Sequence, residues 1–115
     1  MNDRTLLELA ARAAGYKLIW SYDNHCCWIN EMRHDLDVTW NPLTDDGDAL
    51  RLAVQLDITI GPEHPDVVGK SLCRASWNNR NMSLGEFGDG DKPSAYRRAI
   101  VRAAAEIGKS MGGGE

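Results

Sequence analysis

One stretch near the middle of the chain, residues 40–56 with the sequence WNPLTDDGDALRLAVQL, constrains the fold more than any other. Its Asn-Pro pair is typical of a turn, and Thr44 is a natural N-cap for a helix that follows. The first turn of this helix carries three acidic residues, Asp45, Asp46 and Asp48. Acidic side chains stabilise a helix N-terminus because its backbone N–H groups carry partial positive charge. We therefore predict a helix over residues 44–56.

The predicted central helix is apolar over a wide arc of its surface. The apolar residues at helical spacing are Ala49, Leu50, Leu52, Ala53, Val54 and Leu56. Only Asp48, Arg51 and Gln55 form a polar strip along it. A helix with so wide an apolar arc has to be covered on most of its sides. We expect it to be the most buried helix, with the rest of the chain packed around it.

Two further helices are predicted, over residues 3–14 and 93–109. The first begins after Asn2 or Asp3 as its N-cap and ends at Gly15, because glycine readily adopts the left-handed conformation that stops a helix. The last has Pro93 in its first turn, where proline is tolerated. Short runs rich in β-branched and aromatic residues predict strands between the helices. These runs cover residues 17–22, 26–29, 38–40, 57–60, 67–77 and 82–87.

This order of elements predicts an α/β (α+β) fold with one domain, residues 1–111, followed by a flexible glycine-rich tail, residues 112–115. Successive strands in the second half are joined by short loops, which favours antiparallel pairing. The strand at 57–60 is expected to end at its Gly-Pro pair, and residues 61–66 to form a loop. The expected architecture is a layered α-β-α sandwich, with a mostly antiparallel sheet and helices on both of its faces.

The composition is that of an ordinary globular protein, since 43% of the 115 residues are hydrophobic and 26% are charged. The formal net charge of −4 argues against general binding to a phosphate backbone. No apolar run reaches the roughly 18–20 residues that span a bilayer. The N-terminus does not have the pattern of a secretory signal. Three cysteines, two of them adjacent, make a poor disulfide framework. We therefore expect a cytoplasmic protein with no membrane segment.

Three blocks of the sequence point to a known family. The central WNPLTDDGDALRLAVQL, the ending YRRAIVRAAAEIGKSM at 96–111 and the opening LLELAARAAGY at 6–16 resemble small tailed-phage and prophage proteins. Their family is named for a phage ABA (α-β-α) sandwich domain. The resemblance implies a sandwich fold and a phage or prophage origin. It brings no catalytic or binding residues, because the biochemical function of this family is undefined.

No catalytic or metal-binding pattern stands out. The soft metal ligands of the chain are His25, Cys26, Cys27, His34, His64 and Cys73. They lack the paired spacing of a structural zinc site, and adjacent cysteines in a strand point to opposite faces. The acidic group at 45–48 lacks the spacing of a calcium loop, so we interpret it as helix capping. We predict no catalytic residue, no metal, no cofactor and no enzymatic activity. A Cys–His nucleophile pair stays open in principle, although nothing marks its base.

The absence of a catalytic pattern, the small size and the acidic charge favour a binding protein. Together with the resemblance, they predict an accessory protein, encoded by a phage or prophage, that binds a host protein in the host cytoplasm. Inhibition of a host defence system such as CRISPR is one form of this hypothesis. The alternatives are a nucleic-acid-associated factor and a phage assembly protein.

Candidate binding residues lie in segments that are too polar or too awkward for the core, at 23–37, 61–66 and 77–87. The candidates for binding a partner are Trp28, Glu63, His64, Trp77 and Arg80. The two tryptophans would anchor an interface if exposed, and burial in the core is the alternative. The edge of a hairpin could also pair with a second copy, so a homodimer stays open. Nucleic acid or an acidic partner would instead meet the basic face of the last helix, with Arg98, Arg102 and Lys109.

Overall fold

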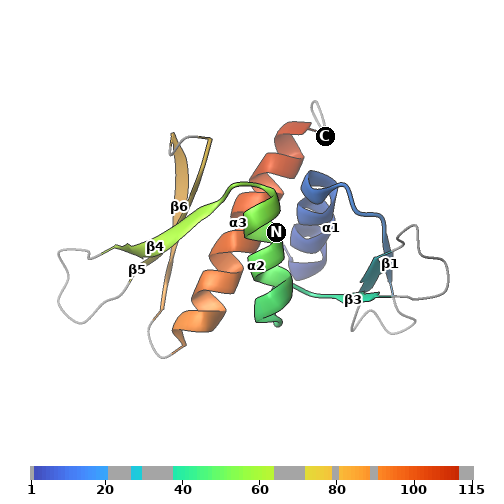
Figure 1. Cartoon of the computed structure of the whole chain (residues 1–115), viewed down its shortest axis with the longest axis horizontal. Coiled ribbons are helices and arrows are strands. Elements are labelled where there is room, and N and C mark those ends of the chain that lie inside the picture. The colour runs from blue at the N-terminus through green and yellow to red at the C-terminus, as the bar shows by residue number, and fades with distance from the viewer. Residues whose placement is uncertain are drawn as a thin grey trace.

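The computed structural model describes residues 2–20, 27–29, 38–63, 72–78, 81–88 and 91–111. The elements in chain order are α1 (Asp3–Ala14), β1 (Leu18–Trp20), β2 (Cys27–Ile29), β3 (Val38–Trp40), α2 (Asp46–Gln55), β4 (Thr59–Glu63), β5 (Leu72–Trp77), β6 (Met82–Phe87) and α3 (Lys92–Met111) (Figure 1). The described helices and strands lie within two residues of the predicted ranges, apart from β4, which begins two residues later and ends three residues later than the strand predicted at 57–60. Residues 21, 22, 26 and 67–71 of the predicted strands lie outside the described part of the chain. The predicted tail at 112–115 lies outside the described residues. No helix among the described residues is both long and apolar enough to cross a membrane.

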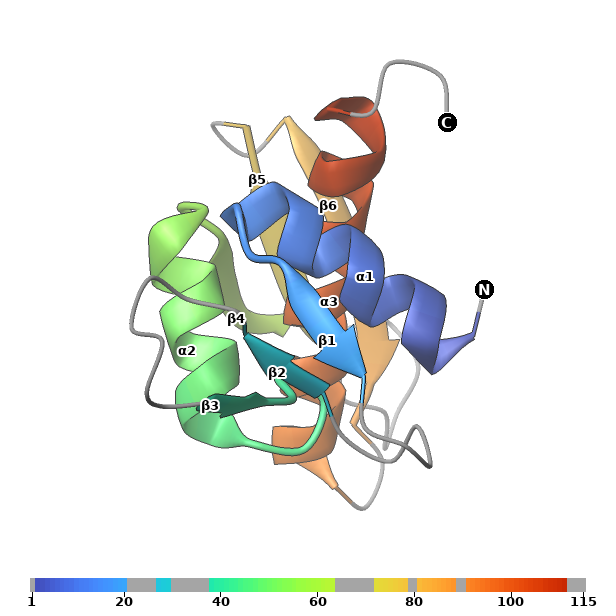
Figure 2. The same cartoon turned by 90° about the vertical axis from the view of Figure 1, so that its right-hand side faces the viewer.

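The described strands form two antiparallel sheets of three strands each, in the orders β1-β2-β3 and β4-β5-β6. The helices lie between these sheets, with one sheet at each end of the long axis (Figure 1). Seen from the end that carries β1-β2-β3, this small sheet lies in front of the helices (Figure 2). The predicted single-domain α+β class and the antiparallel pairing are confirmed. The order of the layers differs from the expected one, because the strands divide between two small sheets instead of forming one.

The longest helix, α3, is the centre of the core. It contacts α1, α2, β5 and β6. Its buried residues are mostly small: Ala95, Ala99, Ile100, Val101, Ala103, Ala104, Ala105 and Gly108. The expectation that α2 would be the most buried helix is therefore wrong. Leu52 of α2 is only 1% exposed, but Leu50 and Val54 are 60% and 69% exposed. Among the described elements α2 packs mainly against α3, so only one side of its wide apolar arc is covered.

Small residues allow α1 and α3 to pack at very short range. Gly108 of α3 lies directly against the backbone of α1. A Cβ atom at this position would overlap the carbonyl oxygen of Leu9 and lie 3.4 Å from the backbone nitrogen of Ala13. Interhelical distance depends on the side chains at the contact, and glycine permits the closest approach. The position of α1 therefore depends on the absence of a side chain at Gly108.

The helix ends follow the capping rules of the sequence, with one change of residue. Asn2 caps α1, since its side-chain oxygen accepts from the N–H of Thr5 at 2.8 Å, and Gly15 ends the helix with a φ of 81°. The sequence predicts Thr44 as the N-cap of α2, but the structure has Asp45 at this position. The hydroxyl of Thr44 donates to a backbone carbonyl of the preceding turn at 3.4 Å. The carboxylate of Asp45 therefore caps the helix.

The β4 strand runs further than the sequence predicts. Its pairing with β5 continues through Gly61, Pro62 and Glu63, so the expected loop at 61–66 is wrong for these three residues. Residues 64–66 lie outside the described part of the chain. Proline is tolerated in an edge strand, where its missing N–H breaks no bond of the ladder. The β4 strand is the edge of its sheet, which explains why Pro62 does not end it.

Candidate protein-binding groove

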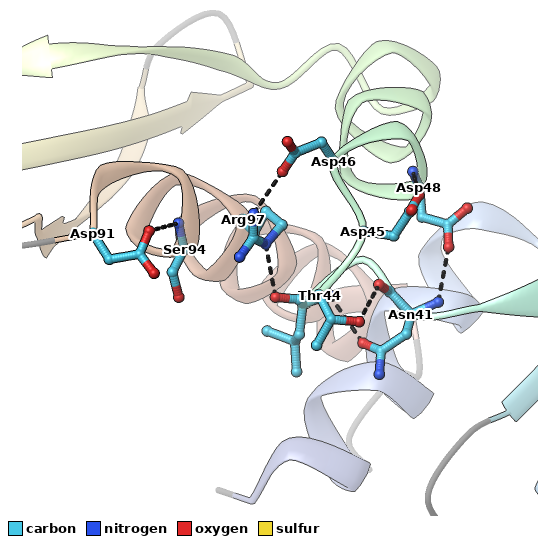
Figure 3. A network of polar contacts seen from close by, with 9 residues as sticks. Asn41, Thr44, Asp45, Asp46, Asp48, Asp91, Ser94 and Arg97 are labelled. Carbon is cyan, nitrogen blue, oxygen red and sulfur yellow. Dashed lines mark hydrogen bonds and ion pairs between the residues drawn. The ribbon is translucent and has the colours of Figure 1, made fainter.

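The acidic group of residues 45–48 serves the fold (Figure 3). The side chain of Asp45 accepts from the backbone N–H of Asp48 at 2.8 Å. Asp48 is 7% exposed, and its carboxylate accepts from the backbone N–H of Asn41 at 2.9 Å. Its other oxygen accepts from Arg51 Nη2 at 2.7 Å. The interpretation as helix capping is confirmed for Asp45, whereas Asp48 lies in the first turn of the helix and binds the backbone of the turn before it.

An arginine of α3 fastens the same segment to the core (Figure 3). Arg97 Nε donates to the carbonyl oxygen of Leu43 at 2.9 Å, and its Nη1 donates to Asp46 Oδ1 at 2.6 Å. Asp91 caps α3 beside this contact, because its carboxylate accepts from the N–H of Ser94 at 3.1 Å. The central motif of the sequence is thus a structural junction between α2 and α3.

Removal of the Asp48 carboxylate tests this structural role. We expect Asp48→Ala to lower the free energy of unfolding by about 1–3 kcal/mol, because the part-buried N–H of Asn41 loses its acceptor. Asp46→Ala is the matched control, since the Asp46 side chain is 78% exposed and such pairs contribute only about 0–1 kcal/mol. Urea denaturation measures both variants. A loss in Asp48→Ala no larger than in the control would contradict the role given to Asp48.

A groove of about 590 Å³ lies between α3 and the hairpin of β5 and β6. The residues that line it are Leu6, Trp77, Met82, Ser83, Leu84, Glu86, Arg98, Arg102 and Glu106. It brings together Trp77, a candidate for protein binding, with Arg98 and Arg102 of the predicted basic face. From the sequence, Trp77 is a candidate for binding a protein, and the two arginines are candidates for binding nucleic acid or an acidic partner. The fold places all three on one surface.

A second hollow, also of about 590 Å³, adjoins the first and shares Trp77 and Met82 with it. The rest of its lining is mostly apolar: Leu56, Asn78, Ile107, Ser110 and Met111. Met82 and Met111 are 49% and 59% exposed, while Trp77 is half-buried against the core. Flexible methionine side chains adapt to partner surfaces of different shape. We call the two hollows together the hairpin groove.

Carboxylates accompany the basic residues of α3. Arg98 pairs with Asp3 of α1 at 3.2 Å, and Arg102 pairs with Glu86 of β6. Lys109, which is exposed, lies 4.0 Å from Glu106. Each of these pairs offsets one positive charge with one negative charge at short range, which lowers the potential that a phosphate backbone would meet. The predicted basic face is therefore close to neutral at its described residues.

The side chains of the other four candidates for protein binding lie outside the described part of the chain, so the structure does not place them at the hairpin groove. The backbones of Trp28 and Glu63 lie in β2 and β4, but their side chains are outside the described part, as are His64 and Arg80. Their roles stay predictions. The two alternatives for Trp77 are an exposed interface anchor and a residue buried in the core. Its side chain is half-buried, because it packs on the core and also lines the hairpin groove.

The described residues contain no group of three His, Cys, Asp or Glu side chains that could hold a metal ion. Of the candidate ligands, His25, Cys26, His34 and His64 lie outside these residues, and of Cys27 only the backbone is described. Cys73 is buried beside Tyr96. Burial, and then the neighbouring thiol, raise the pKa of the Tyr96 phenol above its usual value. The arrangement is that of a packed core, and the absence of a metal stays a prediction.

Sequence reasoning missed the two methionines that flank Trp77. Apolar residues carry little information alone, because many lie at the surface of any protein. A signal was available in the hairpin pattern, since Met82 directly follows the turn after Trp77 and pairs with it across the strands. No protein-family model, curated protein or solved structure matches this chain.

Proposed function

We propose that this chain acts by binding another protein through the hairpin groove. The observation that carries the proposal is that Trp77 and the exposed Met82 line both hollows of the hairpin groove, and that the exposed Met111 lines the more apolar one with them. Protein interfaces commonly have an apolar centre enriched in tryptophan and methionine, with polar residues at the rim. Arg98 and Arg102, with their carboxylate partners, would supply such a rim.

The three sequence blocks that resemble the phage sandwich family support a phage or prophage origin for the chain. We therefore propose a host protein as the partner, bound in the cytoplasm of the host cell. Inhibition of a host defence system such as CRISPR is the narrower form of this proposal. The near neutrality of the basic face speaks for a protein partner over nucleic acid, because nucleic-acid affinity derives largely from uncompensated positive charge.

Affinity capture from host lysate, with a matched pair of variants, tests the binding surface. Met82→Asp places a charge in the hairpin groove, and Leu50→Asp places the same charge on an exposed apolar residue of α2. We expect wild type and Leu50→Asp to capture the same protein and Met82→Asp to lose it. Equal capture by all three would place the interface elsewhere. Co-purification of nucleic acid alone, lost on Arg98→Glu with Arg102→Glu, would favour the nucleic-acid hypothesis.

The narrower form can be tested in living cells. A host strain with an active CRISPR system blocks the plating of a targeted phage. Expression of wild type or of Leu50→Asp is expected to restore plating, whereas Met82→Asp is expected to leave the block intact. If wild type leaves the block intact as well, this defence system is not the target, and general protein binding is judged from the capture experiment.

A further inference from the structure

The edge of β6 borders the hairpin groove. Three consecutive residues of this strand, Met82, Ser83 and Leu84, line the groove. Consecutive side chains of a strand point to opposite faces, and here Leu84 packs on the core while the hydroxyl of Ser83 accepts from Arg74 Nη1 at 2.8 Å. A groove that reaches residues of both faces runs along the edge of the strand. Among the described strands β6 pairs with β5 alone, so the backbone groups of this edge face the groove.

Helix α3 forms the opposite wall of the groove. Arg98, Arg102 and Glu106 follow one another at intervals of four residues, so they form one row about 12 Å long. Glu86 of β6 pairs with Arg102, and Met82 shares the apolar hollow with the last turn of α3. The strand and the helix therefore run in opposite directions along the groove (Figure 1). Because a strand rises about 3.4 Å per residue, an extended segment of about four residues matches the length of the row.

The two ends of the groove differ in chemistry. At one end, Arg98 donates to Asp3 and Arg102 donates to Glu86, and both arginines are partly exposed. A guanidinium group has five N–H donors, so each arginine keeps donors for a further carboxylate. The other end is the apolar hollow, whose described lining has no charged side chain. The first end is therefore complementary to an acidic side chain, and the second to an apolar one.

We infer that the partner bound in the hairpin groove presents an extended segment, which adds to the edge of β6 as a fourth strand. The backbone of such a segment bonds to the edge, and every second side chain points to α3. Inward side chains four positions apart are separated by about 14 Å. The last turn of α3, which borders the hollow, lies about 14 Å further along the helix than the two arginines. An acidic residue can therefore bind Arg98 and Arg102 while an apolar residue four positions away fills the hollow.

This inference rests on the proposed function and names the class of partner. A random-peptide display selection against the purified chain supplies the probe. We expect the enriched peptides to carry an acidic and an apolar residue four positions apart, with no proline between them.

N-methylation of the peptide backbone then tests the mode of binding, because only alternate N–H groups of an added strand point to the edge. N-methylation at alternate positions is expected to weaken binding at least about tenfold, and at the intervening positions to leave it within about twofold.

Variants of the chain locate the peptide. Met82→Asp is expected to weaken binding at least about tenfold, because it places a charge in the apolar part of the groove. Arg98→Glu is expected to weaken it about two- to fivefold, as for an exposed ion pair, and to prefer a peptide with lysine in place of the acidic residue. Leu50→Asp, on the exposed side of α2, is the control and is expected to bind as wild type does.

Equal sensitivity to N-methylation at every position, or the enrichment of no peptide, would overturn the inference. A dimer that Met82→Asp dissociates in sedimentation velocity would also overturn it, because a second copy would then occupy the edge. Capture of a host protein that is lost in Met82→Asp, without any enriched peptide, would leave the proposed function standing and remove only the extended segment. Peptide binding with the expected alternation, but without capture of a host protein, would support the segment and contradict the host partner.

Discussion

Gly108→Ala is expected to destabilise the fold by at least about 3 kcal/mol, at the upper end of the usual cost of overpacking. The added methyl group would overlap the carbonyl oxygen of Leu9 and lie 2.9 Å from its carbonyl carbon. Both are backbone atoms of α1, so they cannot rotate out of the way as a flexible side chain would. The helices would have to separate, and the buried alanines along their contact would lose their packing.

The sign of this effect is what makes it informative. In an exposed helix, replacement of glycine by alanine gains about 1 kcal/mol. A loss at Gly108 therefore reports the close contact with α1 and not the helix itself. Gly61→Ala is the control, because a Cβ atom there would have no neighbour within 4 Å. Its free energy of unfolding in urea is expected to stay within about 0.5 kcal/mol of wild type. A stabilised Gly108→Ala variant would show that α1 does not pack in this way.

Leu52→Ala is the second large effect, with an expected loss of about 2–5 kcal/mol, the usual range for a buried leucine. The Leu52 side chain is 1% exposed, so its removal leaves a cavity in the contact of α2 with the core. Leu50→Ala makes the same chemical change two residues away, where the leucine is 60% exposed. We expect Leu50→Ala to cost only a few tenths of a kcal/mol.

The comparison of Leu52→Ala with Leu50→Ala tests the one-sided burial of α2 in a single denaturation experiment. If both variants lost a similar amount of unfolding free energy, about 2–5 kcal/mol, both faces of the helix would be covered. That result would restore the sequence-based expectation that the whole apolar arc is buried. If neither variant lost more than a few tenths of a kcal/mol of unfolding free energy, α2 would lie on the surface.

The sequence predicts both ends of α1 because the signals there are local. Asn2 and Gly15 act through atoms within a few residues of themselves. Which helix becomes the centre is not a local property. The apolar arc of α2 is broad, but burial depends on what the rest of the chain can place against it. Helix α3 is rich in alanine, which contributes little apolar area and yet permits close packing on several sides.

The candidate groove could be predicted only in parts. Trp77 and the arginines of α3 are visible in the sequence as separate groups, but their meeting depends on how the β5–β6 hairpin docks on α3. The ion pairs that neutralise these arginines could not be predicted from the sequence either. Arg98 meets Asp3 from the other end of the chain, and Arg102 meets Glu86 across the groove. Such ion pairs form only in the tertiary fold, and no residue spacing in the sequence indicates them.

The most direct test of protein binding through the hairpin groove is site-specific photo-crosslinking in host cells. A photoreactive phenylalanine analogue replaces Met82 in one variant and Val54, on the exposed side of α2, in the other. The proposal predicts a covalent adduct with one host protein from position 82 and none from position 54. An adduct from position 54 alone, or a cross-link from position 82 only to nucleic acid, would contradict it.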